Sequence, residues 1–161
     1  MSEELLLSGG ALTVGVVRVG ATVRRPSSSA TSVVCDVLLH LERAGFGSAP
    51  RWLGIDEQGR EILSWIEGDT FTERGRMHPY IGDPPDRVTF SDEQIAASMR
   101  LLRHYHDAFD DAHPGDAADD VAYALRTFVS YGFAPFERGD FVRRTDGALA
   151  AYGENFDVPA I

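Results

Sequence analysis

The stretch between residues 68 and 90 limits how this chain can fold more than any other feature. It carries Gly68, Gly75, Pro79, Gly82, Pro84 and Pro85. Proline lacks a backbone donor and glycine loses much freedom on ordering, so such a stretch interrupts helices and strands alike. Segments that alternate apolar and polar residues precede it, and segments with helical periodicity follow it. We therefore expect a linker or loop over residues 69–90, between a sheet-forming part and a helical part.

Two antiparallel hairpins are predicted before the linker. An apolar run at residues 5–7 is followed by a first hairpin of residues 12–19 and 22–25, which turns at Gly20. A second hairpin joins residues 51–55 to residues 60–66. These strands predict a small antiparallel sheet.

One helix is predicted within the sheet-forming part, over residues 31–44. Thr31 or Ser32 is suited to cap its first turn. Leu38 and Leu41 lie on one face at helical spacing. A small sheet with one packed helix is typical of an α+β lobe.

Three helices are predicted after the linker. The first runs over residues 91–109, where Ser91 and Gln94 have the spacing of a capping box. The second covers residues 116–128, and the third covers residues 144–152. The expected fold class for the whole chain is therefore α+β.

Composition limits the partners and the compartment. The net charge of −10 argues against nucleic acid or an anionic membrane as the main partner. Cys35 is the single cysteine, which excludes a disulfide within one chain. The first residues lack the basic start of a signal peptide, and no apolar run is long enough to span a membrane. We expect a cytoplasmic protein whose main partner is neither a nucleic acid nor a membrane.

Six short segments carry a resemblance to a known family. They are residues 7–10 (LSGG), 17–20 (VRVG), 22–26 (TVRRP), 54–61 (GIDEQGRE), 66–68 (IEG) and 101–107 (LLRHYHD). In combination they resemble the start of the aminoglycoside phosphotransferase and choline kinase-like family. Beyond Ala108, residues 109–124 resemble the family segment that follows the metal-binding aspartate, so the resemblance indicates an internally deleted and C-terminally truncated member.

The resemblance implies a protein-kinase-like fold in three parts. Residues 1–68 would form the nucleotide-binding N-terminal lobe, residues 69–90 a linker, and residues 91–161 a helical remnant of the C-terminal lobe. The missing part of that lobe would leave helical faces exposed, and these could join two copies into a homodimer.

ATP is the cofactor that the resemblance implies, and a small molecule or a nucleotide is the partner that it implies. Ser8, Gly9 and Gly10 match the turn over its phosphates, where small residues let backbone N–H groups approach. Arg24 stands where such kinases carry a phosphate-binding lysine, and an arginine can bind phosphate through two bonds. The alternatives are a plain hairpin turn for the glycines and an exposed strand arginine for Arg24.

Adenine and Mg²⁺ would bind elsewhere on the chain. By position in the family, the carbonyl of Ser64 and the N–H of Ile66 would contact adenine. The metal-binding aspartate should stand where Ala108 is found, and Asp110, two residues later, is the candidate Mg²⁺ ligand.

The catalytic loop of such enzymes is missing. It has the form H-x-D-x-x-x-x-N, yet the single asparagine is Asn155 and Ala150 stands five residues before it. We therefore expect a phosphotransferase by descent, transferring phosphate from ATP to a small-molecule hydroxyl in intact relatives but inactive here. The alternative is a non-catalytic nucleotide-binding or interaction module, or a remnant without function.

A third hypothesis comes from a cluster of histidines and aspartates. Its members are His104, His106, Asp107, Asp110, Asp111, His113 and Asp116. Histidine and carboxylate at near-helical spacing can bind a divalent metal, as in metal-dependent phosphohydrolases. Only two good ligands share a helical face, however, so the alternative is a solvated acidic surface.

Overall fold

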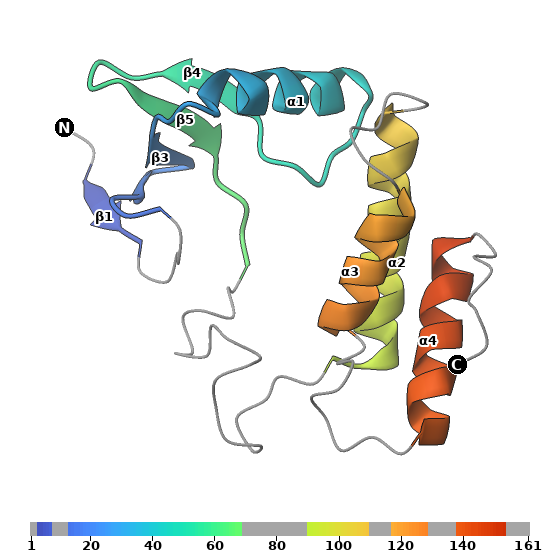
Figure 1. The fold of residues 1–161 in the computed structure, drawn as a ribbon. Coiled ribbons are helices and arrows are strands. Elements are labelled where there is room, and N and C mark those ends of the chain that lie inside the picture. The colour runs from blue at the N-terminus through green and yellow to red at the C-terminus, as the bar shows by residue number, and fades with distance from the viewer. Residues whose placement is uncertain (1–2, 8–12, 69–89, 110–116, 129–137, 154–161) are drawn as a thin grey trace. The chain divides into compact units, whose positions relative to one another are not determined.

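The chain forms two compact units, Met1–Met77 and His78–Ile161, and each is described by itself. Figure 1 shows the computed structural model, which describes residues 3–7, 13–68, 90–109, 117–128 and 138–153. The described strands and one helix belong to the first unit, and three helices belong to the second. The predicted α+β class is confirmed.

A five-stranded antiparallel sheet builds the first unit, in the order β1-β2-β3-β5-β4. Its strands are β1 (Glu4–Leu6), β2 (Val17–Val19), β3 (Thr22–Pro26), β4 (Trp52–Ile55) and β5 (Arg60–Ser64). Four of them, β2 to β5, lie within or beside a predicted strand, whereas β1 overlaps the apolar run at residues 5–7, for which no strand was predicted. β3 ends at its proline, which cannot donate to the ladder.

Two tight turns set the register of the sheet. Gly20 follows β2 with φ of 59°, in the left-handed region that glycine enters without strain. In the turn between β4 and β5, the carboxylate of Asp56 accepts hydrogen bonds from the backbone N–H groups of Gln58 and Arg60, both at 2.9 Å. This is the local bonding that makes aspartate a turn former. Both turns lie where the sequence predicts them.

The helix α1 (Thr31–Arg43) packs against the sheet and buries Leu38 and Leu41, as predicted. The predicted cap is wrong, because the N-cap residue is Ala30, which makes no side-chain hydrogen bond. Thr31 is already helical, and its hydroxyl serves a tertiary contact instead.

That contact is with Glu61, a strand carboxylate that is only 1% exposed. The Thr31 hydroxyl donates to Glu61 Oε1 at 2.5 Å and accepts from the backbone N–H of Ser28 at 2.8 Å. Arg25, opposite Glu61 in the register, donates from Nε to Oε2 at 2.7 Å and from Nη2 to the same oxygen. A charged group out of water needs such partners, so these bonds tie the start of α1 to β3 and β5.

An ion pair joins diagonally opposite parts of the sheet, which indicates that the sheet is curved. Arg60 donates to the two carboxylate oxygens of Glu4 at 2.8 and 3.2 Å. The register places three strand spacings and four residues between them, roughly 20 Å in a flat sheet. That is farther than the two side chains reach. The hydrogen bonds to Glu4, and then to Asp56, raise the pKa of Arg60.

The second unit is a bundle of α2 (Asp92–Phe109), α3 (Ala117–Phe128) and α4 (Arg138–Tyr152). Each helix contributes two residues to the buried core, which contains Ile95, Met99, Val121, Ala124, Ala148 and Tyr152. Packing this core is the main stabilising force of the bundle.

The predicted capping box of α2 is confirmed. The Ser91 N–H donates to Gln94 Oε1 at 2.9 Å, and the Gln94 N–H donates to Ser91 Oγ at 3.2 Å. The prediction for α4 is wrong at its start, because the helix begins at Arg138 rather than at Arg144. The predicted linker lies outside the described residues except for Phe90, so the three-part division stays a prediction. No helix among the described residues is long and apolar enough to cross a membrane.

Candidate functional site

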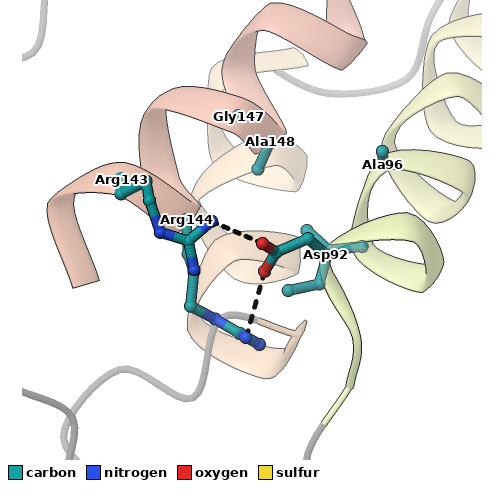
Figure 2. Close-up of a pocket in the computed structure, with 7 residues that line it drawn as sticks. Asp92, Ala96, Arg143, Arg144, Gly147 and Ala148 are labelled. Carbon is teal, nitrogen blue, oxygen red and sulfur yellow. Dashed lines mark hydrogen bonds and ion pairs between the residues drawn. The ribbon is translucent and has the colours of Figure 1, made fainter. Parts of the chain in front are cut away.

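A groove between α2 and α4 is the candidate site, and it lies within the helical unit (Figure 2). Its volume is about 200 Å³. Charged side chains form its rim and small or aliphatic residues form its floor. The lining residues are Asp92, Ile95, Ala96, Arg143, Arg144, Gly147 and Ala148.

The rim is held by one carboxylate between two arginines. Asp92 Oδ2 accepts from Arg143 Nη1 at 2.5 Å, and Asp92 Oδ1 accepts from Arg144 Nη1 at 3.1 Å, as the dashed lines in Figure 2 show. Arg143 also donates from Nε and Nη2 to Asp140 at 3.3 and 3.2 Å. The hydrogen bond from Arg143 lowers the pKa of Asp92, and the same bond raises the pKa of Arg143. Two arginines and two aspartates leave the rim without net charge.

Local sequence explains why the rim assembles here. The capping box fixes the start of α2, which puts Asp92 in its first turn. Arg144, 8% exposed, donates from Nη2 to the Phe90 carbonyl at 2.6 Å. That carbonyl directly precedes the helix, so Arg144 joins the chain entering α2 to the first turns of α4.

The floor is apolar and open. Ile95 and Ala148 are 2% and 1% exposed and belong to the core beneath. Gly147 is exposed on α4, and a Cβ atom added there would meet nothing within 4 Å. The missing side chain at Gly147 therefore leaves open space at this place, and a glycine inside a helix is otherwise unfavourable.

A buried histidine joins the other ends of the helices. His106 Nδ1 lies 2.6 Å from the Tyr152 hydroxyl, and His106 Nε2 lies 3.2 Å from Asp120 Oδ2. This contact connects the last turns of α2 and α4, while Asp92 connects their first turns, so the two helices run parallel. Burial first, and then the charge of Asp120, raises the pKa of Tyr105 beside it. His106 is 8% exposed and Tyr152 is 2% exposed, so their contact stabilises the packing of the two helices and does not form an accessible site.

The predicted metal cluster is not assembled by the residues that the structure describes. Within them, no group of three or more histidine, cysteine or acidic side chains could hold a metal ion. His106 faces the core, and Asp107 accepts from Arg103 at 2.8 Å on the surface. Asp110, the candidate Mg²⁺ ligand, lies outside the described residues, as do Asp111, His113 and Asp116.

The predicted phosphate residues are only partly described. Ser8, Gly9 and Gly10 lie outside the described residues. Arg24 donates from Nη1 to the Thr22 hydroxyl at 2.6 Å and lies 3.6 Å from Asp56. Its side chain is 17% exposed, which is less than the alternative of an exposed strand arginine predicts, and its phosphate role stays a prediction.

The predicted adenine contacts lie at the end of β5. Ser64 accepts from the Arg51 N–H through Oγ at 2.8 Å, and its own N–H donates to the Arg51 carbonyl at 3.0 Å. Ile66 follows the strand and is 53% exposed. Between them, Trp65 lies beneath the Arg18 guanidinium, 4.2 Å from its ring centroid. The roles assigned to Ser64 and Ile66, with ATP and Mg²⁺ as cofactors, stay predictions.

Sequence reasoning missed the groove between α2 and α4. Asp92 and Arg143 are 51 residues apart, and no sequence pattern between them predicts their ion pair. A weak signal was available: Arg143 and Gly147 are spaced to share a helical face, which sets a charged group beside a gap.

Comparison with known proteins gives one informative relative. The chain is 37% identical over 110 residues to the trifolitoxin immunity protein of Rhizobium leguminosarum bv. trifolii. The match covers 67% of this chain and 36% of that protein, so the chain spans about a third of its relative's length. No family model matches the chain, and no solved structure matches it.

This finding corrects the functional reading of the sequence. The resemblance to aminoglycoside phosphotransferases and choline kinases is wrong, because the relative bears the name of an immunity protein and no family model matches. The description of a kinase-like phosphotransferase, which depended on that resemblance, is wrong with it. The alternatives of a nucleotide-binding module, a remnant or a phosphohydrolase gain no support either. The expectations of a homodimer, a small-molecule partner and a cytoplasmic location stay predictions.

Proposed function

We propose that this chain belongs to the machinery that protects a cell against a toxin. The observation that carries the proposal is the 37% identity over 110 residues to the trifolitoxin immunity protein. Because the chain spans about a third of that protein's length, the proposal concerns protection and leaves open which further segments take part.

The geometry of the helical unit agrees with a protein that recognises a toxin. The groove between α2 and α4 is preformed, because ion pairs hold its rim in place before a partner binds. A surface ordered in advance loses less free energy on association than one that must be ordered by its partner.

Growth inhibition tests the proposal directly. We would express the chain in a Rhizobium leguminosarum strain that trifolitoxin inhibits and measure the toxin dose that halves growth. We expect this dose to rise above that of cells with the empty vector. Ile95→Asp, which places a charge at a core position only 2% exposed, is the unfolded control and should give no protection. If the folded chain accumulates in the cells and the dose does not rise, the proposal is refuted.

A further inference from the structure

The geometry points to a specific occupant for the groove between α2 and α4: an aromatic side chain carried by a basic peptide segment. We propose that this segment belongs to the toxin, and in naming that source the inference rests on the proposed function. Three features of the unit support this occupant: the rim of the groove, its floor and the charge of the unit.

The rim is unsuited to an anion although it contains two arginines. All three guanidinium nitrogens of Arg143 already donate to the carboxylates of Asp92 and Asp140. Arg144 donates to Asp92 and to the Phe90 carbonyl and is 8% exposed. The positive charge of Arg143 is therefore already balanced by Asp92 and Asp140, and an incoming carboxylate or phosphate would meet the negative charge of both aspartates. The Arg143 side chain is 57% exposed, so the flat face of its guanidinium is accessible to a partner.

The floor selects an apolar group that is flat enough to lie below that face. Ile95, Ala96 and Ala148 supply apolar contacts, and Gly147 leaves open space where a side chain would stand. A volume of about 200 Å³ is enough for one large side chain and too small for a folded element. A planar guanidinium held in place stacks well on an aromatic ring, which adds to the burial of the ring itself.

The charge of the unit indicates that the segment around this side chain is basic. Residues 78–161 contain 15 aspartates and glutamates but 7 arginines, whereas residues 1–77 contain 10 acidic residues and 8 arginines. The net charge of the chain is therefore concentrated in the unit that carries the groove. Such a field attracts cationic partners and repels anionic ones.

Two matched substitutions on α4 test the inference. Gly147→Leu fills the groove, while Gly139→Leu makes the same change on the same helix outside it. A Cβ atom at either position meets nothing within 4 Å, neither glycine has a left-handed φ, and leucine favours the helix, so both variants should fold. The probes are the peptides acetyl-Arg-Gly-X-Gly-Arg-amide, with phenylalanine, leucine or glutamate at X. Binding to the full ¹⁵N-labelled chain is followed by NMR.

The expected result is that the phenylalanine peptide binds the unmodified chain and Gly139→Leu equally. Binding to Gly147→Leu should be weaker by about tenfold or more, as for the loss of a well-packed anchor. The glutamate peptide should bind more weakly than the phenylalanine peptide. The inference is overturned if the unmodified chain does not bind the phenylalanine peptide, if glutamate binds as well as phenylalanine, or if Gly147→Leu changes nothing.

Protection assays on the same variants separate this inference from the proposed function. If Gly147→Leu protects cells as well as Gly139→Leu does, the groove is not the toxin site, although protection stands. If the phenylalanine peptide binds as expected and the unmodified chain gives no protection, the proposed function fails while the groove remains a binding site for aromatic side chains.

Discussion

Replacing Glu61 by glutamine should destabilise the sheet unit by about 2 kcal/mol while leaving its fold intact. The substitution keeps the size of the side chain and removes its charge. Glu61 is 1% exposed and accepts two hydrogen bonds from Arg25 and one from Thr31. Glutamine has one acceptor oxygen and an amide group that would face these donors.

The magnitude follows from the burial of the partners. Removing one member of a fully buried charge pair costs about 3–5 kcal/mol. The Arg25 side chain is 33% exposed and can regain water, so the expected loss lies below that range. Thr31 keeps the hydrogen bond from Ser28 and can still donate to the amide oxygen. About 2 kcal/mol corresponds to a fall of roughly 8–16 °C in the melting temperature of a unit of this size.

Tryptophan fluorescence isolates the sheet unit in this measurement. The chain has 2 tryptophans, and both of them, Trp52 and Trp65, belong to that unit. Urea unfolding of Glu61→Gln, followed by fluorescence, is therefore compared with that of Glu57→Gln. Glu57 undergoes the same chemical change at an exposed turn position. If the two variants unfold at the same urea concentration, the buried carboxylate does not hold α1 to the sheet.

Three further substitutions test other parts of the fold. Met99 is 0% exposed, so Met99→Ala should destabilise the helical unit by about 2–5 kcal/mol. The midpoint of unfolding, followed by circular dichroism, should fall. An unchanged midpoint would refute the assigned core. Asp92→Asn should lower that midpoint at pH 7, and the difference should shrink as the pH falls through the folded pKa of Asp92. The reason is that the pKa of Asp92 in the folded chain lies below its ordinary 3.8. The stability that the Asp92 carboxylate contributes is therefore present above pH 3.8 and is lost as the pH falls through the lower folded pKa. A difference between the two midpoints that stays constant with pH would contradict this. Gly20→Ala should lower the free energy of unfolding of the sheet unit by about 1 kcal/mol, because Gly20 has a left-handed φ. Gly47→Ala, at a glycine without such a φ, should leave this free energy nearly unchanged in the same fluorescence assay. Equal losses of stability in the two variants would rule out backbone strain as the cause.

Local patterns predicted most elements of the fold, because their signals lie within a few residues. Pro26 ends β3, the aspartate turn at Asp56 separates β4 from β5, and Ser91 with Gln94 marks the start of α2. Where the local signal is weak the prediction is wrong. The first turns of α4 contain Gly139 and several charged side chains, and the sequence indicated that this helix begins six residues too late.

The candidate site could not be predicted, because tertiary contacts create it. The partner of Arg25 is Glu61, 36 residues away on another strand, although the sequence suggested Arg24 as the functional arginine. The groove likewise needs Asp92 and Arg143 brought together over 51 residues. The family resemblance was wrong because it depended on short glycine- and arginine-containing segments, and hairpin turns use such residues in unrelated proteins.

The ion pair between Glu4 and Arg60 makes the far hairpin depend on the first residues of the chain. β1 is a three-residue strand, and among the described strands it lies at the edge of the sheet beside β2. Proteolytic trimming past Glu4 would break this ion pair while leaving Arg60 bound to Asp56. The sheet would then lose a link between β1 and a residue that lies 56 positions farther along the chain.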